Sequence, residues 1–489
     1  MSVLPPPQTL DTVISQSMVA SRNKSATFVQ ATNSEIEGRN RLRFSLKDTN
    51  VGYANTLRRL IITGVETIGF RADMKNDGTT SDVNVIKNST PMTNEMLAHR
   101  IGLIPIYIKN PLEFDPSNFK FVLHKVNNTQ EPLDVKASDF EVYEKVGDDW
   151  TSLDTSKFFP PNPVTKDTCL ITCLKPKMGE NEEEVHVECI ASLGNGRENA
   201  RFIPTCECAY GYSRDDDADK IRKAFESWCS RYKKIDASSL ETDPEKKEIL
   251  MREFNTLEIQ RVYKVDENGE PNSFDFSIES VGILDPKYIL HRACVVGSDL
   301  FARFGEGDEE NEALPEEVYV RPADSEITGF DFLILRQDHT LGNAIQTWLD
   351  LHLIDPNGNI YYAGYKIPHP LKDEMVLRIG VRDNSQSTAI RVFKQATRAL
   401  SNMFASWAKL WEPYVTVRNN SSSNSSSNTS NSNSNSESQT NESYESSNSN
   451  SSSNESSATP TPPPVPIKKT ASRPSIFAKL AKEAKQNKK

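Results

Sequence analysis

The stretch DTNVGYANTLRRLIITGV, residues 48–65, sets the pattern of the chain because a related stretch, DHTLGNAIQTWLDLHL, follows at residues 338–353. Each begins with an aspartate and small polar residues, and each places an asparagine two positions before an apolar residue. The matching positions are Asn55 and Leu57 in the first stretch, and Asn343 and Ile345 in the second. A chain that repeats such a pattern is usually built from two related units.

Residues 48–65 predict a helix with one apolar side. Asp48, Thr49 and Asn50 are the candidate caps at its start. Apolar residues then recur every three to four positions, at Ala54, Leu57, Ile61 and Val65. Arg58 and Arg59 fall off this stripe. We therefore expect the two arginines to serve a surface and not the core.

Length, charge and cysteine usage exclude several classes of protein. The 489 residues are too many for one core, and about three domains are expected. Mean hydropathy is −0.57, and no run approaches the ~20 apolar residues of a membrane span. The net charge of −11 argues against a protein that coats DNA with its whole surface. The seven cysteines without CxxC spacing and the absence of a signal pattern predict an intracellular protein with reduced thiols.

The order of predicted elements gives an α+β fold of two units, with a β-rich domain inserted in the first. Each unit reads as a strand, a helix opening on Asp…Asn, further strands and a long terminal helix. The expected segments are a flexible arm (1–38), a first unit (39–108 with 254–305), an inserted β-rich domain (109–253), an acidic linker (306–325), a second unit (326–412), a disordered Ser/Asn/Pro linker (413–466) and a basic tail (467–489).

The two long terminal helices, expected at 286–300 and 388–411, carry the clearest apolar stripes. Asp285 is a cap, and Pro286 suits the first helical position. The stripe residues are Ile289, Ala293, Val296 and Leu300 in the first helix, and Phe393, Ala396, Leu400, Met403 and Trp407 in the second. The hairpin that precedes the second helix turns at Pro368, His369 and Pro370.

These motifs resemble two subunits of eukaryotic RNA polymerase II, which correspond to the pair of bacterial alpha protomers. FSLKDTNVGYANTLRRLIITGVETI and STPMTNEMLAHRIGLIPI resemble the third-largest subunit, as does LITCLKPKMGENEEEVHVECIASLGNGRENARFIPT in the inserted domain. RQDHTLGNAIQTWLDL and YYAGYKIPHPLKDEMVLRI resemble the eleventh subunit. The fusion of both in one chain is similar to the arrangement in large nucleocytoplasmic DNA viruses.

The resemblance implies an intramolecular pseudo-dimer whose long helices pack on each other, and a non-catalytic role in assembling a DNA-directed RNA polymerase. The implied partners are the two large polymerase subunits and a small alpha-side subunit, with DNA reached only through the complex and no membrane, small-molecule substrate or cofactor. The implied large-subunit interface is Asn55, Leu57, Arg58, Arg59, His99, Arg100, Asp338, His339 and Asn343. The implied location is the virion and the cytoplasmic virus factory if the chain is viral, and otherwise the nucleus.

Two other functions compete with this interpretation. A self-contained interaction protein, such as a homodimeric regulator, would use the same fold without a polymerase. An enzyme would rest only on Glu95 and His99, four positions apart, and on scattered thiols. Residues 103–168 contain no cysteine, so the zinc loop of many relatives is not expected. The tail, with eight lysines and arginines against one glutamate, fits either a solubilising segment or a nuclear-import or nucleic-acid contact.

Overall fold

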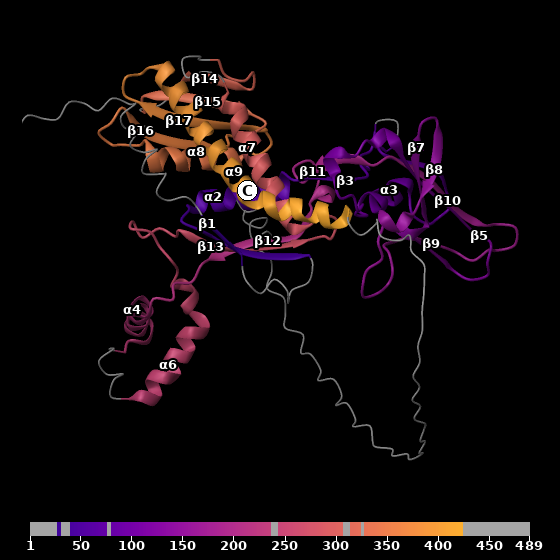
Figure 1. The fold of residues 1–489 in the computed structure, drawn as a ribbon, viewed down its shortest axis with the longest axis horizontal. Coiled ribbons are helices and arrows are strands. Elements are labelled where there is room, and N and C mark those ends of the chain that lie inside the picture. The colour runs from indigo at the N-terminus through magenta and orange to yellow at the C-terminus, as the bar shows by residue number, and fades with distance from the viewer. Residues whose placement is uncertain are drawn as a thin grey trace, which may run out of the picture. The chain divides into compact units, whose positions relative to one another are not determined.

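The computed structural model describes residues 27–30, 40–75, 80–235, 243–306, 313–323 and 327–423 (Figure 1). Buried apolar side chains in this part of the chain form three clusters. The largest cluster joins the two repeat units, the second lies in the inserted domain, and the third holds a pair of helices together. None of the helices described is long and apolar enough to cross a membrane.

The first unit combines a four-stranded antiparallel sheet with two helices. Its elements are β1 (Thr27–Gln30), β2 (Arg41–Lys47), α2 (Val51–Thr63), β12 (Thr205–Tyr212), β13 (Ser273–Ser280) and α7 (Pro286–Gly305). The strand order is β1-β2-β13-β12. Strand β2 alternates as its sequence predicts, because Leu42, Phe44 and Leu46 are buried and their neighbours are not. Of the three candidate caps, Asn50 is the one that α2 uses.

The second unit repeats this arrangement. Its elements are β14 (Val318–Pro322), β15 (Gly329–Leu335), α8 (His339–His352), β16 (Ile360–Lys366), β17 (Glu374–Val381) and α9 (Gln386–Ser423), and the sheet order is β14-β15-β17-β16. Strands β2 and β15 are both seven residues long. Strand β2 is followed by Asp48 and strand β15 by Arg336, and both residues have positive φ. The caps of the next helices, Asn50 and Asp338, come two residues later. The repeat in sequence is therefore also a repeat in structure, position by position.

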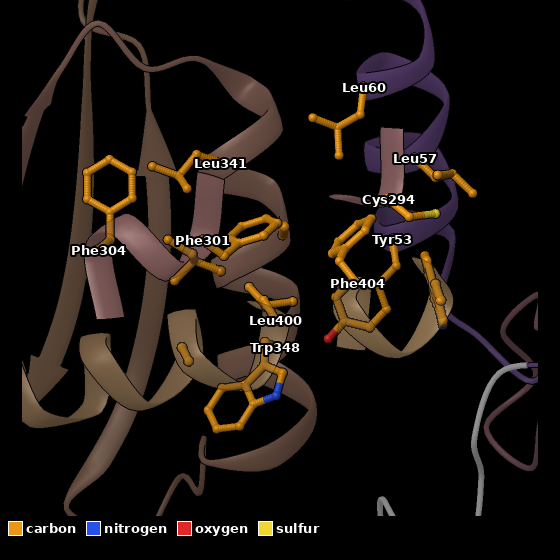
Figure 2. Close-up of a cluster of buried hydrophobic side chains, with 14 of the residues drawn as sticks. Tyr53, Leu57, Leu60, Cys294, Phe301, Phe304, Leu341, Trp348, Leu400 and Phe404 are labelled. Atoms are coloured by element: carbon orange, nitrogen blue, oxygen red, sulfur yellow. The ribbon is translucent and has the colours of Figure 1, made fainter. Parts of the chain in front are cut away.

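Helices α7 and α9 pack along each other and give the two units one common core. Phe301 of α7 stacks on Phe404 of α9 with ring centroids 5.6 Å apart, and Phe304 meets Phe393 edge-on at 6.4 Å. Figure 2 shows side chains from α2, α7, α8 and α9 in this single cluster. The two repeat units therefore share one core within a single chain.

The nine stripe residues of the two terminal helices all belong to this common core. Six are buried: Ile289, Ala293, Phe393, Ala396, Leu400 and Trp407. Three are partly buried and pack against the same cluster: Val296, Leu300 and Met403. Helix α7 begins at Pro286 behind its cap Asp285, as the sequence predicts, and continues to Gly305.

The inserted domain has its own core, and that core extends further than the sequence boundaries. Its elements are β3 (Glu66–Gly69), β4 (Val83–Asn88), α3 (Asn94–Gly102), β5 (Phe119–Asn127), β6 (Leu133–Lys136), β7 (Phe140–Val146), β8 (Asp149–Leu153), β9 (Leu170–Leu174), β10 (Glu183–Cys189) and β11 (Ser192–Asn195). The main sheet has the order β4-β10-β5-β7-β8, while β6 pairs with β9 and β11 with β3. The expected boundary at residue 109 is wrong, because the apolar sides of β4 and α3 pack into this core.

The far boundary at residue 253 is also wrong. Strand β12 pairs with β13 and so belongs to the first unit's sheet. Most of its residues are exposed or half-buried, because it is an edge strand, and its sequence TCECAYGY therefore lacks a clear apolar alternation. After it come α4 (Ala218–Trp228), a π-helical turn (Cys229–Lys233) and α6 (Pro244–Leu257), which form the small third core around Phe225, Trp228 and Phe254.

Three further segments differ from the sequence analysis. Residues 27–30 of the expected arm form strand β1, which pairs with β2. Residues 318–322 of the expected linker form strand β14, which pairs with β15. Its first residue, Val318, is buried in the common core. Helix α9 continues to Ser423 past Pro413, where Tyr414 still packs its ring on Trp411. The rest of the predicted disordered linker and the basic tail lie outside the described residues.

Candidate functional site: the crossing of helices α2 and α8

The two Asp…Asn helices begin in the same way, and each start is fixed locally. The side chain of Asn50 accepts a hydrogen bond from the amide of Gly52 at 2.8 Å. The side chain of Asp338 accepts one from the amide of Thr340 at 2.8 Å. Each bond satisfies an amide that would otherwise have no partner at the helix N-terminus. Helices α2 and α8 then lie against each other.

Arg59, one of the paired arginines, has its partners in the second unit. Its Nε donates to Thr340 Oγ1 at 2.7 Å, and its Nη2 donates to Asp338 Oδ2 at 3.0 Å. Arg59 is one of the residues expected at the large-subunit interface, and the carboxylate that it meets in this structure belongs to the same chain. One repeat motif therefore binds the other directly.

The negative charge on Asp338 is stabilised by neighbouring hydrogen bonds and cations. Burial alone would raise the pKa of its carboxyl, but the hydrogen bonds from Thr340 and the charges of Arg59 and Arg197 together lower this pKa below its usual range. Asp338 is thus ionised at neutral pH. Both side chains of the Arg59–Asp338 pair are about a third exposed, at 29% and 34%, so solvent screens the pair in part.

The other interface candidates on these two helices have different places. Leu57 is fully buried in the common core and has no surface to offer a partner. Asn55 and Arg58 are half-buried, and Arg58 Nε donates to Asn55 Oδ1 at 3.1 Å. His339 is exposed, with Nδ1 3.2 Å from the hydroxyl of Tyr365.

Asn343 lies at the helix crossing itself, because its Oδ1 is 2.9 Å from where a Cβ on Gly52 would be.

The candidates on α3 belong to the inserted domain. His99 and Arg100 are both exposed. Arg100 holds α3 to strand β9, because its Nε donates to the carbonyl of Ile171 at 2.7 Å and its Nη2 to that of Leu170 at 3.0 Å. The structure thus groups His99 and Arg100 with a different core from Arg58 and Arg59.

The three residues of the hairpin turn, 368–370 between β16 and β17, are all exposed. The Nδ1 of His369 accepts a hydrogen bond from the amide of Leu371 at 3.1 Å, which fixes the turn. Leu371 itself is 89% exposed, so an apolar side chain stands at the tip of this hairpin.

Two charged contacts made to the second unit, one by the inserted domain and one by the first unit, were not predicted from the sequence. Arg197, in the loop after β11, donates from Nη2 to the carbonyl of Arg336 at 2.7 Å and lies 3.4 Å from Asp373 Oδ1. Glu317 is buried, and its carboxylate accepts from Arg303 of α7 and, at 2.9 Å, from Arg336. Neither Arg197 nor Glu317 belongs to the repeated motifs, so the repeat does not indicate a role for either residue.

No described group of three or more His, Cys, Asp or Glu side chains is placed to hold a metal ion. Glu95 and His99 are exposed on α3. Asp215 is buried, and its Oδ2 accepts a hydrogen bond from Lys220 Nζ at 2.6 Å.

Comparison with known families agrees with this geometry. The RNA polymerase Rpb3/Rpb11 dimerisation domain matches residues 43–301, and a second description of the same domain matches residues 330–409. The chain belongs to this family of alpha-like RNA polymerase subunits.

Individual relatives each match about half of the chain. The DNA-directed RNA polymerase subunit Rpo3 of Methanobrevibacter smithii is 28% identical over 287 residues, which is 54% of this chain and 94% of that protein. Subunit RPB3 of RNA polymerase II from Schizosaccharomyces pombe is 26% identical over 263 residues, which is 52% of this chain and 78% of that subunit. The subunit rpac1 of RNA polymerases I and III from Dictyostelium discoideum is 25% identical over 284 residues, which is 53% of this chain and 75% of that subunit.

Proposed function

We propose that this chain is a non-catalytic assembly subunit of a multisubunit DNA-directed RNA polymerase and that it supplies both alpha-like units from one polypeptide. The observation that carries the proposal is the common core, in which α7 and α9 cover each other's apolar stripes. The three relatives described above are all RNA polymerase subunits. Joining the units raises their effective concentration to roughly the millimolar range, so assembly needs no separate pool of the second unit.

In this proposal the surface beside the α2–α8 crossing docks the two large catalytic subunits. Arg58 and Asn55 on α2 and His339 on α8 remain at least partly exposed after the units have packed. Arginine suits a desolvated contact with a planar carboxylate or a backbone carbonyl. A small alpha-side subunit completes the partners, and DNA is reached only through the complex.

The test is purification of the tagged full-length chain from its native source, followed by mass spectrometry and a primer-extension assay. We expect two large subunits and template-dependent RNA synthesis in the same fraction. A chain that purifies alone, or as a homodimer, would contradict the proposal and would instead fit a self-contained interaction protein.

A pair of charge reversals locates the docking surface. Arg58→Glu is expected to lower the yield of co-purified large subunits about tenfold, because a carboxylate would face their acceptors. Arg222→Glu is the matched control, since Arg222 is an exposed arginine on α4 that pairs only with Asp219 of its own helix among the interactions described. Equal yields from both variants would place the docking surface elsewhere.

A further inference from the structure

The crossing of α2 and α8 has two ends, which the repeat makes equivalent in position but not in chemistry. Counted from the two helix caps, Arg59 occupies the same position in α2 as Thr347 in α8. In the same way Gly52 corresponds to Thr340. A perfectly symmetric dimer would have identical contacts at both ends. Here the two ends differ in charge and in size.

One end of the crossing is large and charged. The guanidinium of Arg59 reaches the start of α8, where it meets the hydroxyl of Thr340 at 2.7 Å and the carboxylate of Asp338 at 3.0 Å. The carboxylate caps α8 as well, so it is held in place for the arginine.

The other end is small and neutral. A Cβ on Gly52 would lie 2.6 Å from Thr347 Oγ1 and 2.9 Å from Asn343 Oδ1, which is closer than real Cβ contacts come. Thr347 therefore fits against α2 only because residue 52 is a glycine. The cap at this end is Asn50, a neutral amide.

A first unit that met a copy of itself would place Arg59 where Thr347 now lies. The guanidinium would then lie opposite Gly52 and Asn50 instead of Thr340 and Asp338. It would face the positive end of a helix dipole whose cap is a neutral amide and not a carboxylate. Such a pairing would leave the charge of Arg59 without its carboxylate partner.

A second unit that met a copy of itself would fail for a different reason. Thr347 would then face Thr340, whose Cβ occupies the space that Gly52 leaves empty. Asp338 would lose its guanidinium and remain as a partly buried carboxylate without a cation.

We propose that the α2–α8 crossing determines pairing specificity, so that each unit accepts the unlike unit and rejects a copy of itself. Charge complementarity at the end built from Arg59 and Asp338 disfavours both like pairings, and steric exclusion at the end built from Gly52 and Thr347 disfavours the pairing of two second units. The inference concerns the isolated chain and does not depend on docking to polymerase subunits. In a fused chain it prevents two molecules from joining through their like halves.

The charged end is tested with Arg59→Glu in the full-length chain, measured by mass photometry and by light scattering after gel filtration. The variant sets a carboxylate against Asp338, so the ratio of monomer to dimer and larger species should fall at least about threefold relative to wild type. Adding Asp338→Asn keeps the cap of α8 and removes the repulsion, so the double variant should recover most of the monomer.

The matched control is Arg58→Glu, the same charge change at the neighbouring position, whose side chain bonds Asn55 in its own helix. It should leave the oligomeric state unchanged. If Arg59→Glu is insoluble, the charge-neutral set Arg59→Gln, Asp338→Asn and their combination replaces it. Each single variant should then raise the dimer fraction, and the combination should raise it no further than the larger single effect.

Gly52→Ala tests the steric end and should also raise the dimer fraction, because the added methyl group removes the space for Thr347. The proposal is overturned if Arg59→Glu and Gly52→Ala lower the thermal midpoint yet remain monomeric, since the contacts would then stabilise the fold without selecting the partner. It is equally overturned if Arg58→Glu dimerises as much as Arg59→Glu.

Discussion

Phe28 of strand β1 meets Trp411 of helix α9 edge-on, with ring centroids 5.7 Å apart. The same phenylalanine contacts Trp407 at 5.6 Å and Phe44 of strand β2 at 5.7 Å. The first strand described in the chain and the last helix described thus close the two units over each other. An edge-to-face cluster of this kind adds to the burial of its rings.

Phe28→Ala is expected to loosen this closure. Loss of the ring removes three aromatic contacts, so the common core should lose about 1–3 kcal/mol of stability and the tryptophan emission should shift to the red. Thermal unfolding followed by intrinsic fluorescence measures both effects. Tyr319→Ala, at a position 54% exposed, is the control, and an equal effect there would contradict the role of Phe28.

Phe404→Ala tests the packing of α9 on α7. Phe404 is fully buried, so the truncation should leave a cavity and cost about 3–5 kcal/mol. Leu410→Ala in the same helix, at a position 51% exposed, should cost less than about 0.5 kcal/mol. Chemical denaturation followed by far-ultraviolet circular dichroism compares the two. Similar midpoints for both variants would mean that the helices do not depend on this core.

Gly297→Ala tests how closely α7 approaches its neighbours. A Cβ at Gly297 would lie 2.8 Å from Leu60 Cδ1 and from Phe404 Cδ1, so the added methyl group should destabilise the core by about 1–3 kcal/mol. Gly211→Ala, in strand β12, is the control because nothing lies within 4 Å of its Cβ position. Differential scanning calorimetry of the two variants should show a lower midpoint only for Gly297→Ala.

Asp338→Asn should change how stability depends on pH. Because folding lowers the pKa of Asp338, its contribution is complete above the unfolded pKa of about 3.9 and disappears as the pH falls through the lower folded value. The side chains of Asp338 and Arg59 are each about a third exposed. The free energy of unfolding of wild type should therefore exceed that of the variant by only about 1 kcal/mol near pH 7. Urea unfolding between pH 2 and pH 7 should show the two curves converging at the acid end. A constant difference over that range would exclude ionisation of Asp338 as the cause.

Local signals in the sequence predicted the elements of both units well. The helix caps Asp285 and Asn50 and the alternation of β2 depend only on neighbours in the chain, and sequence patterns report such interactions directly. The stripes of α7 and α9 also marked the common core, because amphipathic periodicity requires a covered face.

What the sequence could not predict was which surface groups would meet. Both Arg59 and Asp338 were selected as interface residues, but their pairing depends on the docking of two distant helices. Strands β12 and β14 escaped because short edge strands carry weak alternation, and their pairing partners lie elsewhere in the chain. The boundary of the inserted domain was misplaced because only the packing of side chains shows that α3 joins its core.

The order of α7 and α9 along the chain has a consequence for synthesis on the ribosome. Phe301 emerges about a hundred residues before its stacking partner Phe404, which corresponds to roughly 5–20 s of translation. During that interval the side chains of α7 that pack on α9 have no partner from that helix. Two separate polypeptides would have to find each other by diffusion, at a rate set by their abundance. In this chain α7 can pack on α9 as soon as the ribosome has completed α9, and the time that this takes does not depend on how many copies of the protein the cell contains.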